Sequence, residues 1–343
     1  MDAVKALAIL LVVYGHTIQY ISGTDFWNNR IFQIIYSVHM PMFFVVSGFF
    51  FVGTHKKTFR EFITKKATAL LLPCLVWATL SGIASLALNG DLRAFFLQII
   101  TPQGWPFWFL KGLFVVQLVA WLCLVAAQKV VKRHFVIYAA ALSMAVYLIP
   151  NMDVPRVMLP FFWVGWFIRR HYEQLLAHSG VIAVVSGLIF VILLQFWDRE
   201  GMRFYAGTTL NIYTYFSGLS LPWKDWLMLL FRILIGVSGS VAIIALMHLF
   251  QHVPRYVLQV GQSTEAVYIL QACLLEHLVG DFIAIKTNWM TPLQQLQPVI
   301  LFGVALPIIA LLYVCVCTML YLPTHRLPHL AVPLFGGYYH KEK

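Results

Sequence analysis

The chain has 343 residues, of which 61% are hydrophobic and only 11% are charged. Soluble globular domains carry about 25% charged residues, so this composition excludes an ordinary water-soluble enzyme. A chain of this length cannot hide so much apolar surface in its own interior, and lipid must cover the remainder. We therefore expect an all-α integral membrane protein, with residues 1–343 forming a single domain in the bilayer and no soluble domain.

The net charge of +11 raises the question of a nucleic-acid partner, which the placement of the basic residues answers. They fall in short clusters between apolar runs, at residues 55–57, 65–66, 129–134 and 169–171. A nucleic-acid-binding face would require a basic patch outside the membrane, and the sequence offers none. The charge therefore indicates the orientation of a membrane protein, whose partner is the lipid bilayer and not nucleic acid.

The cysteines give no sign of a disulfide framework or a metal site. All five lie inside apolar segments, at Cys74, Cys123, Cys273, Cys315 and Cys317. They form no CxxC pair and no Cys/His cluster with the spacing of zinc ligands. We therefore expect neither a structural disulfide nor a bound metal.

Apolar stretches of membrane-spanning length follow one another along the whole chain. They predict about ten transmembrane helices, at residues 3–21, 31–52, 68–88, 107–128, 134–150, 155–169, 180–197, 227–250, 264–284 and 299–321. The fifth and sixth are short and close together, which predicts a tight helical hairpin or one broken pair. The first lacks a small-residue cleavage site, so we interpret it as a retained helix and not as a signal peptide. It begins so near Met1 that we expect the natural start to lie upstream.

The loops between these stretches differ in their basic residues. With the N-terminus inside, the cytoplasmic loops and tail hold about twice as many Lys and Arg residues as the outer loops, among which we count Arg156. The positive-inside rule and an even number of spans then place both termini in the cytoplasm. The long non-apolar segment 198–225, rich in Tyr, Thr and Gly, faces outward in this topology.

Ionisable side chains inside apolar helices are costly, so each one needs a reason. Lys5 and His16 are eleven residues apart in the first stretch, so they share a helix face and stand about 16 Å apart along its axis. Lys5 is equally well explained as a surface anchor that pairs with Asp2 at i, i+3. In the second stretch, His39 is expected about 12 Å below the outer face, and His16 about 8 Å below it.

Two histidines at similar depth on adjacent helices admit two interpretations. Each one alone is as well explained by a hydrogen bond between helices. Together they predict the lining of a polar cavity in the outer half of the membrane. A kink at Pro41 and the small pair Ser47-Gly48 would let backbone and ligand approach closely there.

Further polar groups interrupt the later apolar stretches. Snorkelling toward the membrane surface explains four of them, Lys111, Arg232, Glu276 and His277. Glu265 and Gln271 are expected deeper in the membrane. The aromatic run at 105–109, which includes Trp108, is typical of an interfacial aromatic belt.

Several of these features occur together, in order, in one known family. Residues 2–16, DAVKALAILLVVYGH, resemble the opening signature of the membrane-bound acyltransferase-3 family. That signature consists of an acidic residue, a basic residue three positions later, a long apolar run and a histidine. Residues 39–50, HMPMFFVVSGFF, resemble its second-helix motif. Three weaker motifs follow in order, namely Lys65-Lys66 ahead of Leu72-Pro73, residues 107–110 (FWFL) and residues 261–271 (GQSTEAVYILQ). The resemblance covers essentially the whole chain and is nearest to members similar to fucose 4-O-acetylases.

The chain departs from the family pattern at three points. The basic residue of the first helix is usually arginine and is Lys5 here, which cannot hold a phosphate bidentately. The cytoplasmic motif lacks a second basic residue before its proline, where Ala69 and Leu70 stand. The late segment ends in Gln271 instead of histidine, which implies that a late histidine is not essential to the chemistry.

The resemblance implies an enzyme of a bacterial inner membrane that moves an acyl group, usually acetyl, from cytoplasmic acyl-CoA to a hydroxyl. The acceptor would be a glycan or a small polar molecule. His16 would act as the catalytic base or as a transient acyl carrier, and His39 as the orienter of the acceptor or its proton partner. Lys5, Lys65 and Lys66 would bind the phosphates of CoA, and Asp2, the partner of Lys5, would belong to the same acyl-CoA site. Three would contact the substrate, namely Ser47, Trp108 and Glu265.

The residues alone leave other classes of function open. A secondary transporter or proton-coupled channel could use the same histidines as a relay. The sequence has no inverted repeat and no pair of broken helices to support that reading. A purely structural membrane subunit is the third alternative, and it leaves the histidine pair unexplained.

Overall fold

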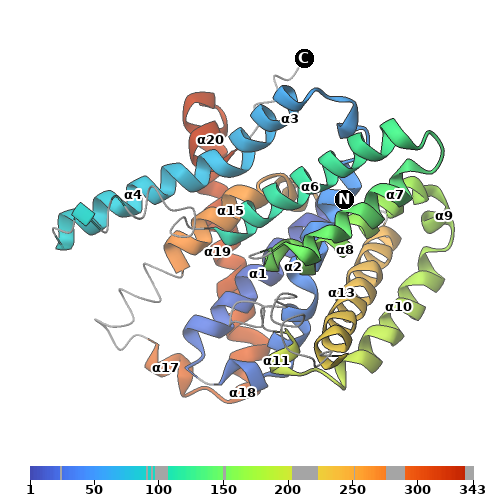
Figure 1. Ribbon diagram of the computed structural model, residues 1–343. Helices are drawn as coiled ribbons and strands as arrows, with labels where there is room; N and C mark the ends of the chain where they lie inside the picture. Colours follow the sequence, from blue (N-terminus) through green and yellow to red (C-terminus); the bar gives the residue numbers. More distant parts are fainter. Residues whose placement is uncertain are drawn as a thin grey trace.

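The computed structural model describes residues 1–23, 25–89, 107–149, 152–202, 223–250, 252–275 and 290–336, together with residues 92, 93 and 96. All regular structure in these residues is helical (Figure 1), as expected. The first part of the chain forms α1 (Asp2–Ile21), η1 (Phe26–Asn28), α2 (Arg30–Phe50), η2 (Thr54–Lys56), α3 (Phe59–Lys66), η3 (Ala67–Leu71), α4 (Leu72–Asn89), α6 (Trp108–Val130), α7 (Phe135–Ser143) and η4 (Met144–Leu148). The second part forms α8 (Asp153–Arg170), α9 (Tyr172–Ala177), α10 (Ser179–Leu194), α11 (Arg199–Met202), α13 (Trp223–Leu249), α14 (Arg255–Gln262), α15 (Thr264–Gln271), α17 (Thr291–Gln294), α18 (Pro298–Ile300), η6 (Leu301–Ala305), α19 (Leu306–His325) and α20 (Pro328–Phe335).

Among the described residues, six helical stretches are long and apolar enough to cross a membrane, so the protein is a multi-pass membrane protein. They are Asp2–Ile21, Arg30–Phe50, Phe59–Ile83, Trp108–Val130, Trp226–Leu249 and Pro298–Thr324. The predicted count of about ten is not confirmed, because three of the other apolar helices, Phe135–Leu148, Ser179–Leu194 and Thr264–Leu275, are shorter. Helix α8 lies at the position of the sixth predicted span, but it carries four charged residues.

Polar residues at their starts explain where two of the early helices begin. Helix α2 starts at Arg30 because the Asn29 side chain accepts a hydrogen bond from the Phe32 amide (3.0 Å). Helix α3 starts with a capping box, in which the Thr58 hydroxyl and the Glu61 carboxylate each accept a hydrogen bond from the other residue's amide. This cap sets the position of Lys65 and Lys66 in the last turn of α3.

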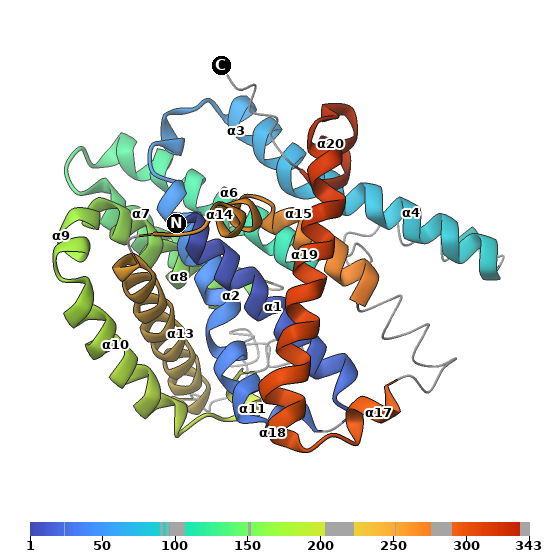
Figure 2. The ribbon, with the colours of Figure 1, turned by 180° about the vertical axis from the view of Figure 1, so that it is seen from behind.

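Contacts at the two ends of α1 define two ends of the molecule. At its start, Gln262 of α14 donates a hydrogen bond to Asp2 (3.4 Å), and at its finish Gln294 of α17 donates to the Ile21 carbonyl (3.1 Å). Figure 2 shows α1 running from α14 toward α17 and α18. Cations of two helices lie over the last rings of α2, since Lys5 is 5.8 Å from the Phe50 ring and the Arg169 guanidinium 5.2 Å from the Phe49 ring. We call the end of the molecule where α1 begins and where α2 and α8 end the basic end. The basic clusters at residues 55–66, after α2, and at residues 169–171, at the end of α8, lie there.

Two glycines allow α2 and α8 to touch through their backbones. A Cβ atom added at Gly48 of α2 would collide with the carbonyl oxygen of Phe162, and one added at Gly165 of α8 with that of Val45. Small residues at such crossings are the usual device by which membrane helices approach closely. The contact is reciprocal and lies next to Ser47 on one helix and Trp166 on the other. The contact therefore fixes which side chains of α2 and of α8 point toward the neighbouring helices.

The predicted hairpin at residues 134–169 is held together by a buried arginine. Arg156, which we counted among the outer-loop residues, lies in α8 and is only 2% exposed. Its Nε donates to the Val146 carbonyl (3.3 Å), another guanidinium nitrogen donates to the Ile149 carbonyl, and the Tyr147 hydroxyl donates to the Arg156 carbonyl (2.7 Å). A cation at the end of η4 satisfies carbonyl groups that the end of a helix leaves without partners.

The reciprocal glycine contact yields a testable prediction. Gly165→Ala should lower the free energy of unfolding by about 1–3 kcal/mol or more, because the added methyl group must separate two backbones. Thermal unfolding in detergent measures the loss. Gly187→Ala is the matched control, since a Cβ at Gly187 in α10 meets nothing within 4 Å. It should be neutral or stabilise the helix by up to about 1 kcal/mol. Equal stability of the two variants would contradict the role of the contact.

Candidate active site

A cavity of about 190 Å³ opens between α1, α2, η3, α6 and α15 near the basic end. It brings together three of the residues predicted from the sequence, Lys5, Ser47 and Glu265. The rest of its lining is mostly apolar, namely Met40, Phe43, Val46, Phe50, Leu70, Phe109, Leu110, Leu113, Thr264 and Tyr268. A narrow apolar space with a few polar groups is the usual form of a small-molecule site.

Lys5 combines the two roles that the sequence left open. Its ammonium group pairs with the Asp2 carboxylate (2.7 Å), as a surface anchor would. The same side chain lies over the Phe50 ring and lines the cavity. Asp2 lies outside the cavity and is held by Lys5 and by Gln262. Asp2 therefore orients the Lys5 ammonium at the entrance of the cavity.

Glu265 is the acidic residue of the cavity, and it lies in the first turn of α15. A carboxylate in the first turn of a helix is stabilised by the helix dipole. Its Oε1 atom is buried and accepts no hydrogen bond from any residue that the structure describes. Lys66 interacts with it electrostatically and lies over the Phe51 ring (5.9 Å). The carboxylate thus faces the cavity with a cation nearby and an acceptor atom unused.

The wall behind Glu265 is made by a distorted helix and a glycine turn. Residues Ala67–Leu71 form a turn of π-helix, a feature that is frequent at functional sites. Gly336 closes α20 in the left-handed conformation (φ 66°), and a side chain there would collide with the Ala69 carbonyl and the Glu265 carboxylate. Trp77 fastens α20 to α4 by donating a hydrogen bond to the Leu334 carbonyl (2.9 Å).

Ser47 is held by a residue that the sequence analysis missed. The Gln117 side chain of α6 donates a hydrogen bond from Nε2 to the Ser47 Oγ (2.8 Å). Because Ser47 accepts this bond, its own hydroxyl hydrogen is left to donate into the cavity. Gln117 is only 4% exposed, and its Oε1 is buried without a hydrogen bond in the described part of the chain. The signal that could have found it is a single amide in the middle of an otherwise apolar helix.

The two histidines lie near each other, outside the lining of the cavity. They are close enough to interact electrostatically, and Arg232 also acts on His39. The His39 Nδ1 lies 2.7 Å from the Ile35 carbonyl, which can only accept, so Nδ1 carries a hydrogen. A neutral His39 therefore keeps the lone pair on Nε2, as a base requires. His16 stacks on Tyr20, with ring centroids 6.1 Å apart. Met40, which follows His39, forms part of the cavity wall.

The other predicted residues that the structure describes do not line the cavity. Lys65 is exposed on α3, beside Lys57, and belongs to the basic end. Trp108 begins α6 beside Phe109, which lines the cavity, with ring centroids 6.3 Å apart. Gln271 is fully buried in α15. Most of the segment 198–225, which we expect to face outward, lies outside the described residues, as do Glu276 and His277.

These features define a class of protein. It is a multi-helix membrane protein with a narrow, mostly apolar cavity that contains a few polar side chains and lies near its basic end. The class becomes a family when the chain is compared with known proteins. A family model described as an acyltransferase domain matches residues 1–322, so the chain belongs to this acyltransferase family. The resemblance inferred from the motifs is thereby confirmed.

Two curated relatives share the similarity, and both are named nodulation protein NolL. The one from Mesorhizobium japonicum is 27% identical over 330 residues, which cover 90% of this chain and 84% of the relative. The one from Sinorhizobium fredii is 29% identical over 212 residues, which cover 58% of this chain and 57% of the relative. No solved structure matches the chain.

The bond between Gln117 and Ser47 yields a second prediction. Gln117→Leu removes the donor and should lower kcat/KM for acyl transfer roughly 3- to 10-fold, because the Ser47 hydroxyl loses its orientation. Ser47→Ala should cost at least as much, and the double variant should be no worse than Ser47→Ala alone. A double-mutant cycle measures this coupling, with thermal stability recorded in parallel. Strictly additive losses would show that Gln117 does not act through Ser47.

Proposed function

We propose that this protein transfers an acyl group, in the first place acetyl, from cytoplasmic acyl-CoA to a hydroxyl of a glycan or small polar acceptor. The observation that carries the proposal is the cavity at the basic end, which combines the Lys5 cation, the Glu265 carboxylate and the Ser47 hydroxyl in a narrow apolar space. Membership of the acyltransferase family supports it. Acyl transfer by the purified protein from labelled acetyl-CoA to candidate glycans is the direct test.

The size and charge of the cavity favour a CoA thioester as donor. A volume of about 190 Å³ is below the roughly 300–1,000 Å³ of pockets that hold whole drug-sized ligands. It suits the thin pantetheine arm, while the phosphates stay outside. There the five basic residues between Lys56 and Lys66, with Lys5 at the entrance, provide positive charge for a polyanion.

The polar groups inside the cavity match the amide groups of the arm. The Ser47 hydroxyl has a hydrogen to donate, which suits a carbonyl oxygen. Glu265 has an acceptor atom without a partner among the described residues, which suits an amide N–H. A buried polar group without a hydrogen bond costs about 1–3 kcal/mol, so a ligand that supplies the bond recovers that free energy.

The histidines supply the acid–base chemistry in this proposal. The acceptor oxygen attacks the thioester carbonyl, a neutral His16 takes the hydroxyl proton, the C–S bond breaks, and the CoA thiolate leaves and is protonated. In the covalent variant His16 itself carries the acyl group between donor and acceptor. His39, with its lone pair on Nε2, orients the acceptor hydroxyl or relays the proton. Trp108 and residues 198–225 shape the acceptor site.

The relatives and the sequence support the proposed acceptor and the proposed membrane. The likeness of the motifs to fucose 4-O-acetylases supports a glycan hydroxyl as acceptor. Both named relatives come from bacteria, which supports the bacterial inner membrane as location. The bias of Lys and Arg residues toward one set of loops supports cytoplasmic termini. The basic end then faces the cytoplasm, where acyl-CoA is made.

Lys66 offers a test of the donor site and its side. Lys66→Ala should raise the KM for acyl-CoA roughly 10- to 100-fold, with little effect on the KM for the acceptor, because a charge-assisted contact is lost. Lys65→Ala is the matched control, and its smaller effect should disappear as salt rises, because Lys65 is exposed. Acyl-CoA added to inverted vesicles should support transfer, and acyl-CoA added to right-side-out vesicles should not. An unchanged KM for acyl-CoA in both variants would show that Lys65 and Lys66 only orient the protein in the membrane and do not bind the donor.

The histidines offer a test of the mechanism. His16→Gln should keep the fold and acyl-CoA binding yet lose on the order of 10² to 10⁴ in turnover, because glutamine cannot take the proton. The same change at His39 should cost less if His39 only orients the acceptor. Turnover, acyl-CoA affinity and thermal stability of both variants are measured together. If His16 only bonds to a neighbouring helix, the variant should stay active while losing about 1 kcal/mol of stability, and such a result would sink the mechanism.

A further inference from the structure

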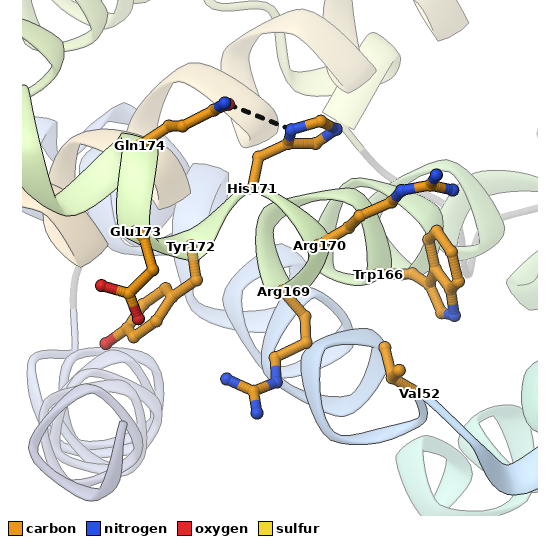
Figure 3. Close-up of a pocket in the computed structure, with 8 residues that line it drawn as sticks. All are labelled: Val52, Trp166, Arg169, Arg170, His171, Tyr172, Glu173 and Gln174. Atoms are coloured by element: carbon orange, nitrogen blue, oxygen red, sulfur yellow. Dashed lines mark hydrogen bonds between the residues drawn. The ribbon is translucent and has the colours of Figure 1, made fainter.

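A second cavity, of about 540 Å³, lies where α8 ends at the basic end (Figure 3). We call it the phosphate cavity. It is lined by Val52, which follows α2, and by Trp166, Arg169, Arg170, His171, Tyr172, Glu173 and Gln174. None of these residues belongs to the candidate active site, and all but Val52 lie on α8, α9 and the residue that joins them.

The cations of the phosphate cavity are available to an anion. Arg169 and Arg170 are exposed, and neither forms an ion pair with any residue that the structure describes. Figure 3 shows the Glu173 carboxylate beside Tyr172, on the side away from Arg170. His171 uses its Nδ1 on the Gln174 side chain (3.1 Å). Figure 3 shows the two guanidinium groups on different sides of the end of α8, so each offers its own contact to an anion.

The Trp166 ring forms an apolar wall of the phosphate cavity. Trp166 is only 5% exposed, and its Nε1 atom is buried. Figure 3 shows this nitrogen on the side of Val52, away from the Arg170 guanidinium. The wall therefore suits the apolar part of a ligand, and the arginines supply the charge.

An apolar groove continues from the phosphate cavity. It has a volume of about 450 Å³ and shares His171 and Gln174 with the phosphate cavity. Its remaining lining is Val164, Phe167, Ile168, Leu175, His178 and Ile182. Figures 1 and 2 both show α9 and α10 at the outer edge of the helical bundle. On α10, Val181, Val184 and Leu188 are more than half exposed, as expected of a lipid-facing surface.

We propose that the phosphate cavity and the apolar groove together bind one anionic phospholipid. The lipid phosphate lies against the exposed guanidinium groups where α8 ends, and an acyl chain lies in the groove along α8, α9 and α10. The groove decides between sources of phosphate, because a soluble phosphate or nucleotide has no chain to fill it. The bound lipid contacts Val52, which follows α2, together with residues of α8 and α9. Because the lipid binds only the folded protein, it stabilises the basic end.

The test measures lipid binding and not acyl transfer, so its outcome is independent of the proposed function. The parent protein in nanodiscs with phosphatidylglycerol should melt at a higher temperature than in phosphatidylcholine alone, and native mass spectrometry should retain phosphatidylglycerol. The double variant Arg169→Gln with Arg170→Gln should bind this lipid with an affinity lower by on the order of tenfold or more, because charged hydrogen bonds are lost.

Two controls separate the alternatives. The double variant Lys132→Gln with Arg133→Gln removes the same charge from an exposed loop outside both cavities, and it should bind phosphatidylglycerol like the parent. Inorganic phosphate and adenosine 3′,5′-bisphosphate, which carry no acyl chain, should not replace the lipid. Equal loss in the control variant, equal melting in both lipids, or full stabilisation by adenosine 3′,5′-bisphosphate would each overturn the proposal.

Discussion

The backbone contact between α2 and α8 is the constraint on which the rest of the arrangement depends. Gly48 and Gly165 each admit a carbonyl oxygen of the other helix, so the two helices have essentially one way to pack. That packing turns Ser47 toward α6 and the active-site cavity. It also places Val52 and Trp166 in the wall of a different cavity at the basic end. One pair of glycines thus couples the two binding regions proposed for this protein.

Polar side chains in the helices of this membrane protein are few, and several of them interact with one another in pairs or small groups. Gln262 donates a hydrogen bond to Asp2, which pairs with Lys5. Lys66 interacts electrostatically with Glu265, and Gln117 donates a hydrogen bond to Ser47. In each set one member faces the cavity and another fixes its position or charge. Such sets prepare a site before the ligand arrives, which lowers the free energy needed to organise the groups during reaction.

The sequence predicted the positions of several helices better than the contacts between them. Bounds for α1, α2 and α6 agree with the apolar stretches to within about two residues, because lipid imposes long uninterrupted runs. The motifs identified Lys5, Ser47 and Glu265, which the fold brings to one cavity. Gln117 and the Ala67–Leu71 distortion were missed, because hydropathy does not reveal which helices face each other. Partners across helices are a property of packing, and a single sequence does not encode them in any simple pattern.

Arg156 has a consequence for how the chain enters the membrane. An arginine within an apolar segment disfavours insertion into the membrane, and Arg156 is the fourth residue of α8. The carbonyls that satisfy Arg156 belong to Val146 and Ile149, which the ribosome makes first. We therefore expect α8 to leave the translocon together with the preceding segment, as one hairpin. The order of synthesis supplies the acceptor groups before the charge that needs them.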